Sequence, residues 1–487
     1  MRSIASILVA LALLCAAGVP VSATPAETQE RSLAEIYQEP AGQILGAALV
    51  DEQGWRDLTY LTTVIGHRLS GSPQLEEAID WALQRMREDG LDTAHRQPVM
   101  VPHWVRGDES AEVLAPRPRR LNILGLGRSV GTPPEGITAP VVVVESFDEL
   151  EALGREAVEG KIVAYAVPWV GYRGTVAYRS RGASRAAALG AVAVLVRSAT
   201  GSSLDTPHTG ALRYDDEQPQ IPAASMTPED SEWFKRMEAL GQEVTVRLKM
   251  EAKTLEDALS ANLVVEIPGR EKPEEVVVMG GHYDSWDVGQ GAHDDGAACV
   301  AAWRALALIH QLGLQPRRTL RVVLWTNEEN GLAGGRAYHE NLGEAVRQHV
   351  AAIEMDGGAE MPVGFALGWA GVGRDSEDPE ADSPDFAAAM DTLRDIAQLL
   401  AAIEADEITS GGGGADIGPL MRDGVPGLAL RTVGEHYFDW HHTNADTLDK
   451  VDPTAFRRAI AMLGIMGYVL ADMPGRLLPP EFESPHP

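Results

Sequence analysis

The sequence is poor in cysteine and in basic residues, and each shortage excludes a class of protein. Among 487 residues the only cysteines are Cys15 and Cys299, which excludes a small fold held together by several disulfides. Lys and Arg total 41 against 71 Asp and Glu, for a formal net charge of −30. Nucleic-acid binding depends on neutralising phosphates with Lys and Arg, so we expect no nucleic-acid partner.

The first residues predict that the chain is exported. Arg2 supplies a positive charge, residues 4–17 form an apolar run, and residues 21–23 (Val-Ser-Ala) are a small-residue cleavage site. The apolar run is shorter than the roughly 20 residues that span a bilayer, which disfavours the alternative of an uncleaved anchor. We predict a signal peptide over residues 1–23, a secreted or periplasmic location, and no membrane attachment after cleavage.

The rest of the chain divides into regions of different texture. Residues 24–117 carry amphipathic, helical runs, including one that begins at Ser72-Pro73 and stops near Gly90. Residues 118–255 alternate short apolar runs with Gly- and Pro-rich turns, which indicates a β-rich unit with a helix or two. Residues 256–475 alternate strand, loop and helix, the pattern of an α/β fold with a largely parallel central sheet. Residues 476–487 are predicted to be a solvated tail.

Metal-type ligands follow four of the predicted strands. Open parallel sheets bind their ligands outside the carboxyl ends of the strands, so these side chains are expected to share one crevice. A histidine or aspartate at one strand end has ordinary structural explanations, whereas four together favour a site. The residues are His282 and Asp284 with Asp294 beyond them, Glu328 and Glu329, Asp356, and the pair His441 and His442.

These residue types suit two zinc ions. Zinc takes histidine nitrogen and carboxylate oxygen, and catalytic sites keep one position for water. Two histidines and three carboxylates, one of them bridging, would give each metal three protein ligands. Two Zn²⁺ would then be balanced by three carboxylates and a bridging hydroxide. Of Glu328 and Glu329, one could bind metal while the other serves as general base. Cobalt or manganese would accept similar ligands.

Four segments resemble the di-zinc aminopeptidase and glutamate carboxypeptidase family. They are GHYDSWDVGQGAHDDG, WTNEENGLAGG, AAIEMDGG and WHHTNADT. The resemblance extends over nearly the whole mature chain, including Gly66-His-Arg-Leu-Ser-Gly-Ser72. It implies the zinc exopeptidase fold, in which a mostly parallel mixed sheet is flanked by helices. It also implies that residues 118–255 are an inserted protease-associated domain.

The resemblance assigns the metal ligands residue by residue. His282 and Asp356 would bind one zinc, Glu329 and His442 the other, and Asp294 would bridge them. His442 is chosen over its neighbour because His-Thr-x-x-Asp-Thr matches the spacing in the family.

The same resemblance implies roles around the metals. Glu328 would be the general base, and Asp284 would orient the first histidine. Asp295 would follow an unusual cis peptide bond. His441 lies where some relatives have a tyrosine that polarises the scissile carbonyl, but a supporting structural role is favoured. His293 is expected to be a loop residue at the rim of the site.

Other residues give weaker signals. Arg336, Arg374 and Arg431 could each hold a substrate carboxylate through a forked contact, although surface ion pairing is the default for all three. Residues 437–440 (Tyr-Phe-Asp-Trp) could line a side-chain pocket or belong to the core. Asp416 matches a segment that recurs in the family, without an assignable role.

Together these features predict an exported di-zinc metallo-exopeptidase that hydrolyses small peptides or dipeptides with a free N-terminus. Amino-, carboxy- and dipeptidase specificity stay open. Two alternatives are a mono-zinc enzyme like the glutaminyl cyclases and a non-catalytic, receptor-like binding protein. The complete ligand set and the presence of Glu328 disfavour both. The resemblance also suggests a homodimer.

Overall fold

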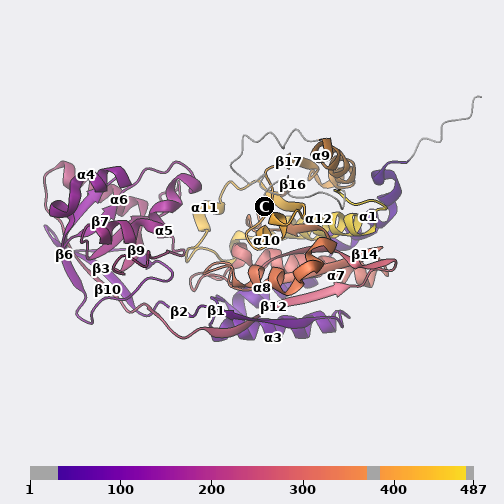
Figure 1. The fold of residues 1–487 in the computed structure, drawn as a ribbon, viewed down its shortest axis with the longest axis horizontal. Coiled ribbons are helices and arrows are strands. Elements are labelled where there is room, and N and C mark those ends of the chain that lie inside the picture. Colours follow the sequence, from indigo (N-terminus) through magenta and orange to yellow (C-terminus); the bar gives the residue numbers. More distant parts are fainter. Residues whose placement is uncertain (1–30, 370–383, 479–487) are drawn as a thin grey trace, which may run out of the picture.

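The computed structural model describes residues 31–369 and 384–478. It has two lobes, each built on an eight-stranded sheet (Figure 1). The predicted signal peptide, most of the predicted tail and Arg374 lie outside the described residues.

The first sheet is mixed, as predicted. Its strand order is β1-β12-β14-β13-β15-β18-β16-β17. The pairings from β14 through β13 and β15 to β18 are parallel, as is that of β16 with β17, and the remaining pairings are antiparallel. The strands are β1 (His95–Val101), β12 (Ala258–Ile267), β13 (Lys272–His282), β14 (Arg318–Trp325), β15 (His349–Glu354), β16 (Pro362–Gly368), β17 (Glu407–Ser410) and β18 (Gly427–Thr432).

Helices cover this sheet and bury its apolar strands. Residues 276–279 (Val-Val-Val-Met) of β13 are all buried, as expected for a parallel strand covered on both faces. Helix α12 is long and apolar enough to span a membrane, but 83% of its most apolar window is buried, which makes it a core helix. The helices are α1 (Leu33–Leu49), α2 (Gln53–Tyr60), α3 (Pro73–Glu88), α7 (Ala297–Gln311), α8 (Ala333–Leu342), α9 (Pro384–Ala397), α10 (Gly418–Arg422), α11 (Tyr437–Trp440) and α12 (Pro453–Asp472).

The second lobe is an α/β unit, with more helix than the β-rich unit with a helix or two that was predicted. Its sheet has the order β4-β3-β10-β6-β7-β8-β9-β5, with parallel pairing from β6 to β9. Helices α4 (Phe147–Val158), α5 (Tyr172–Ala188) and α6 (Pro228–Ala239) connect the strands. The strands are β3 (Glu109–Ala115), β4 (Arg119–Leu121), β5 (Ile123–Gly125), β6 (Ile137–Val144), β7 (Ile162–Tyr165), β8 (Ala193–Arg197), β9 (Ala223–Met226) and β10 (Thr245–Met250).

The chain enters and leaves the second lobe at one place. Strands β2 (Trp104–Val105) and β11 (Lys253–Thr254) pair with each other in a two-stranded ribbon. This ribbon lies between the lobes (Figure 1). The lobe is therefore an insertion between β1 and β12, and its sheet begins at Glu109, before the predicted boundary at residue 118.

The segment predicted to be helical contains α1, α2 and α3, but it also contributes strands to both sheets. Helix α3 starts as its sequence indicates, because the Ser72 hydroxyl accepts a hydrogen bond from the Leu75 amide and Pro73 occupies the first turn. Strand β1 then pairs antiparallel with β12 at the edge of the first sheet. Polar and apolar residues alternate too irregularly in β1 for the sequence alone to predict a strand there. The pairing with β12 makes this segment a strand.

Candidate active site

The four predicted strand ends converge at one edge of the first sheet. The strands β14, β13, β15 and β18 are adjacent and parallel. His282 ends β13, Glu328 and Glu329 follow β14, Asp356 follows β15, and His442 lies in the loop after β18. The topology therefore brings together residues that are far apart in the sequence, as the strand pattern predicts.

Asp294 is the centre of this cluster. Its Oδ1 lies 3.0 Å from His282 Nε2, and its Oδ2 lies 3.4 Å from His442 Nε2. Asp356 Oδ1 is 3.4 Å from His282 Nε2, and Glu329 Oε2 is 3.0 Å from His442 Nε2. One carboxylate thus faces two histidine–carboxylate pairs, one with each oxygen.

The donor set suits divalent cations. Asp294 Oδ2 and Glu329 Oε1 are buried and have no hydrogen-bond partner among the described residues, which is costly unless a cation approaches them. His282, Asp294 and Asp356 are close enough to hold a metal ion, as are Asp294, His441 and His442. Nitrogen and carboxylate oxygen are ligands of zinc.

His442 lies nearer than His441 to the carboxylates of the cluster. The His441 Nε2 is 3.9 Å from Asp294 Oδ2, farther than the 3.4 Å of His442, and only His442 also reaches Glu329. The two rings are stacked with centroids 3.5 Å apart. His442 has a left-handed backbone (φ 61°), a strained conformation of the kind found at functional sites.

Burial dominates the electrostatics of the cluster. Burial raises the pKa of Glu328 to about 8, with the charges of Asp356 and Asp284 adding to the effect. Burial likewise raises the pKa of Asp294 and lowers that of His442. In the absence of a cation these groups resist ionisation, and a divalent ion among them would restore the charged carboxylates.

Asp284 contacts the site differently from the prediction. The His282 Nδ1–H donates to the main-chain oxygen of Asp284 at 2.9 Å, whereas the Asp284 carboxylate lies 3.9 Å from Nδ1. That carboxylate accepts a hydrogen bond from the Glu328 amide at 3.0 Å. Asp284 therefore connects His282, through its carbonyl, to the turn that carries Glu328.

Asp446 is a supporting residue that the sequence did not reveal. Its carboxylate accepts hydrogen bonds from the amides of Ala292, His293 and Asp294 at 3.0, 2.7 and 3.2 Å. It therefore fixes the turn that presents Asp294. Its place in the WHHTNADT segment was the one available signal.

Arg68 supports the same region from the N-terminal segment. Its side chain is fully buried and donates to the carbonyls of Gly66, Tyr283, Gln290 and Gly291 at 2.9–3.0 Å. The guanidinium thus ties the loop after β13 to the segment before α3. The GHRLSGS segment was noticed in the sequence, but only the fold shows what Arg68 contacts.

The turn at Asp294 and Asp295 is tightly packed. The Asp294–Asp295 peptide bond is cis, as the family resemblance implied. Asp295 Oδ2 accepts the His282 amide at 3.1 Å. A Cβ on Gly281 would lie 2.1 Å from the same oxygen, so glycine is needed there for this approach.

Several predicted candidates lie outside the cluster. His293 is buried rather than at the rim; its Nε2–H donates to the Lys450 carbonyl at 3.0 Å, and its Nδ1 accepts the Ala359 amide at 2.9 Å. Arg336 is exposed and donates to the Gly331 carbonyl. Arg431 pairs with Glu407 at 3.2 Å. Arg431 therefore forms a surface ion pair, which was its default interpretation.

Asp416 and Tyr437 lie near the cluster. Both carboxylate oxygens of Asp416 are buried without a partner in the described chain. Burial raises the pKa of Tyr437, and the charges of Asp294 and Asp356 raise it further, so its hydroxyl keeps its proton. Tyr437 and Phe438 of this segment pack against His441, with ring centroids 5.1 and 5.4 Å away.

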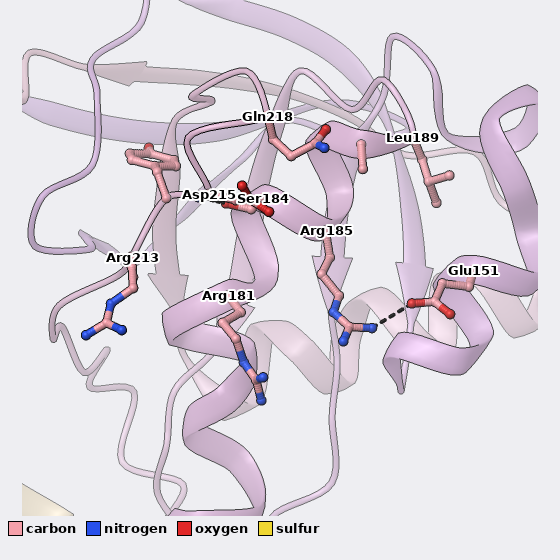
Figure 2. A pocket seen from close by; sticks show the side chains of 10 residues that line it. Glu151, Arg181, Ser184, Arg185, Leu189, Arg213, Asp215 and Gln218 are labelled. Carbon is pink, nitrogen blue, oxygen red and sulfur yellow. Dashed lines mark hydrogen bonds and ion pairs between the residues drawn. The ribbon is translucent and has the colours of Figure 1, made fainter.

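The second lobe also reaches the site. Tyr172, at the start of α5, stacks on Phe438 with centroids 5.1 Å apart and meets His441 edge-on at 5.4 Å. Elsewhere in this lobe, a cavity of about 540 Å³ contains none of the cluster residues; Arg181, Arg185 and Arg213 are among the side chains that line it (Figure 2).

The geometry agrees with what is found by comparison with known proteins. The model of "Peptidase family M28" matches residues 262–465, which span all the cluster residues. Carboxypeptidase Q of Mus musculus is 42% identical over 440 residues, covering 90% of this chain and 90% of that protein. The chain belongs to peptidase family M28. It is therefore a zinc metallopeptidase.

Solved structures agree with this assignment. A peptidase M28 precursor from Shewanella amazonensis is 33% identical and has a TM-score of 0.83, with 91% of this chain and 99% of that chain covered. A zinc aminopeptidase from Bacillus subtilis is 18% identical with a TM-score of 0.63, covering 87% of this chain and 96% of that chain. At that identity the second likeness concerns the fold alone.

Proposed function

We propose that this M28 peptidase is an exported di-zinc exopeptidase that hydrolyses dipeptides and other small peptides with a free N-terminus. The observation that carries the proposal is the position of Asp294, with one oxygen 3.0 Å from His282 and the other 3.4 Å from His442. A carboxylate between two histidine–carboxylate pairs has the arrangement of a ligand that bridges two cations.

His282 and Asp356 would hold one zinc, and Glu329 and His442 the other. When bound, the metals would polarise the scissile carbonyl and lower the pKa of a water molecule. Five ligands with a shared aspartate favour two metals over the single metal of a cyclase. The retained Glu328 disfavours a receptor that has lost catalysis.

Glu328 is the residue that we propose as general base. It is not a member of either histidine–carboxylate pair, and its amide is fixed by the Asp284 carboxylate at 3.0 Å. Its carboxylate would take the proton of the attacking water and then deliver that proton to the leaving amine. Asp284 would position both Glu328 and His282 from behind.

The remaining predictions concern the setting of the site. We propose that residues 1–23 are a cleaved signal peptide and that the mature enzyme is secreted or periplasmic without a membrane anchor. The inserted lobe is proposed to be a protease-associated domain, and the enzyme is proposed to form a homodimer. Likeness to carboxypeptidase Q, at 42% identity, supports a peptide-sized substrate.

The substrate proposal is tested by comparing dipeptides with their N-acetylated forms. We expect hydrolysis of free dipeptides and little or none of acetylated ones, because the acidic crevice attracts the substrate ammonium. Equal rates on both forms would contradict the requirement for a free N-terminus. Dipeptides with an amidated C-terminus distinguish aminopeptidase from carboxypeptidase specificity, since an aminopeptidase would still cleave them.

A further inference from the structure

The Nδ1 atoms of His282 and His442 form hydrogen bonds with different lobes of the molecule. His282 Nδ1–H donates to the Asp284 carbonyl at 2.9 Å, within its own lobe. His442 Nδ1–H instead donates to the main-chain oxygen of Thr209 at 3.2 Å. Thr209 belongs to the inserted lobe, and its amide returns a hydrogen bond to the His442 carbonyl at 2.9 Å. A reciprocal pair of bonds thus joins the lobes at this histidine.

Thr209 is itself held firmly. It is fully buried, and its hydroxyl donates to the Gly125 carbonyl at 2.7 Å and accepts from Arg106 Nη2 at 3.3 Å. Arg106 in turn forms an ion pair with Asp287 at 2.6 Å. The Thr209 carbonyl is therefore a fixed acceptor, not a mobile loop atom.

Arg179 of α5 backs this acceptor. Its Nη1 donates to the Thr209 carbonyl at 3.4 Å, and its Nη2 donates to the Tyr172 hydroxyl at 2.8 Å. The same Nη1 also lies 3.4 Å from His442 Nδ1, farther than the 3.2 Å between that nitrogen and the Thr209 carbonyl. Gly210 has φ +136°, and a Cβ there would lie 2.3 Å from Arg179 Nη1. The glycine allows the guanidinium to pack against the loop.

We propose that Thr209, backed by Arg179, is a positioning residue for one metal of the pair. The proposal rests on the proposed function. It means that the inserted lobe helps to position His442, a ligand of the metal that Glu329 and His442 would hold. Because Nδ1 is engaged by the Thr209 carbonyl, His442 keeps the tautomer whose Nε2 lone pair faces Glu329 and Asp294. Partners behind a ligating histidine fix its orientation and basicity, and their loss commonly weakens metal binding about 10–100-fold. His282 Nδ1–H donates within its own lobe, so a metal held by His282 would not depend on Thr209.

The first test is Thr209→Val in the full chain, with Thr175→Val as its matched control. Thr175 is also buried in the inserted lobe, and its hydroxyl also donates to a main-chain carbonyl, that of Gly171 at 2.9 Å. Zinc is removed, then returned in competition with a chromophoric chelator, and the two affinities are measured. Thr209→Val keeps the main-chain carbonyl but removes the hydroxyl contacts with Gly125 and Arg106 that fix it. We therefore expect it to weaken the binding of one of two zinc ions about tenfold and leave the other unchanged. Thr175→Val should leave both unchanged.

A second pair of variants serves if Thr209→Val does not fold. Arg179→Met removes the backing guanidinium, while Arg181→Met removes an exposed arginine that lines the separate cavity (Figure 2). Loss of a positive charge alone would tighten cation binding, so weaker binding in Arg179→Met would report orientation. Arg181→Met should match the wild type.

The outcomes separate this inference from the proposed function. Two zinc ions in the wild type, with unchanged affinities in Thr209→Val and unchanged or tighter binding in Arg179→Met, would overturn the inference alone. One zinc or none in the wild type would overturn both. Equal weakening of both metals would overturn the selective role of Thr209.

Discussion

Each lobe places parallel strands at the centre of an eight-stranded sheet, but different residues follow those strands. In the first sheet, strands β13, β14 and β15 lead to His282, Glu328 and Asp356. In the second, strands β6, β7, β8 and β9 are followed by Glu145, Ala166, Ser198 and Thr227. The comparison shows that the carboxyl ends of parallel strands form a location where an active site can be built. The side chains at those ends determine whether an active site is present.

The lobes are nevertheless joined at the chemical site. Thr209 of the inserted lobe contacts His442, and Ser202 donates to Asp439 of α11. We infer that the second sheet shapes the site through its loops instead of contributing ligands. Matched substitutions in the two lobes can test that division.

The largest expected contrast is between two glutamates that follow strands. Glu328→Gln should lower kcat by about 10³-fold or more, because it removes the proposed base and acid, within the range of such catalysis. Glu145→Gln should leave kcat unchanged, since Glu145 is a surface partner of Lys235 at 3.0 Å. Steady-state kinetics and metal content measure both. Turnover near the wild-type level in a Glu328→Gln enzyme with full metal content would contradict the mechanism.

The next contrast is between two buried aspartates that accept main-chain amides. Asp446→Ala should weaken metal binding about 10–100-fold, because three amides around Asp294 lose their acceptor. Asp230→Ala in the second lobe, where Asp230 accepts the Asn122 amide at 3.3 Å, should lower stability only. Chelator competition and thermal unfolding distinguish the two effects. Equal losses of metal affinity would remove the difference between the lobes.

The smallest contrast concerns stability and pH. Although burial raises the pKa of Glu275, hydrogen bonds from Arg476 and Arg318 outweigh it and lower the pKa to about 2. A carboxylate whose pKa is lower in the folded protein than in the unfolded chain stabilises the fold at pH values above its unfolded-state pKa. This stabilisation is lost as the pH falls toward 2. Glu275→Gln should therefore cost roughly 1–2 kcal/mol at pH 7 and progressively less at acidic pH.

Glu109 in the second lobe should behave in the opposite way. Burial raises its pKa despite the nearby Arg106, so its ionisation opposes folding at neutral pH, and acid relieves that cost. As the pH falls, the stability of the wild type relative to Glu109→Gln should therefore rise, whereas its stability relative to Glu275→Gln should fall. Unfolding by urea at pH 4 to 7 measures both differences. Parallel trends would contradict the assigned directions.

Much of the first lobe could be predicted from sequence, because its strands are short apolar runs that end in chemically distinctive residues. His282, Glu329 and Asp356 were placed at strand ends, and the fold brings these ends together. Strands β1, β12, β16 and β17 were not predicted, since none of them is a plain apolar run. Strands β1 and β16 contain proline, β12 begins with mixed polar and apolar residues, and β17 has only four residues. Such segments become strands through packing against their neighbours more than through local propensity.

The supporting contacts could not be predicted for a related reason. Asp446, Arg68 and Thr209 act through main-chain amides and carbonyls, which leave no mark on the sequence. The second lobe was expected to be β-rich with a helix or two because short apolar runs alternate there with Gly- and Pro-rich turns, and the helices α4 and α6 were not predicted. Asp284 was expected to orient His282 by its carboxylate, whereas its carbonyl has that contact.

The most direct test of the central claim measures metal content and dipeptide hydrolysis of the purified mature protein, before and after chelation. The account predicts about two zinc ions per chain, consistent with the two donor groups that share Asp294, and hydrolysis that is lost on chelation and regained with zinc. One metal or none, or hydrolysis that survives complete metal removal, would contradict it.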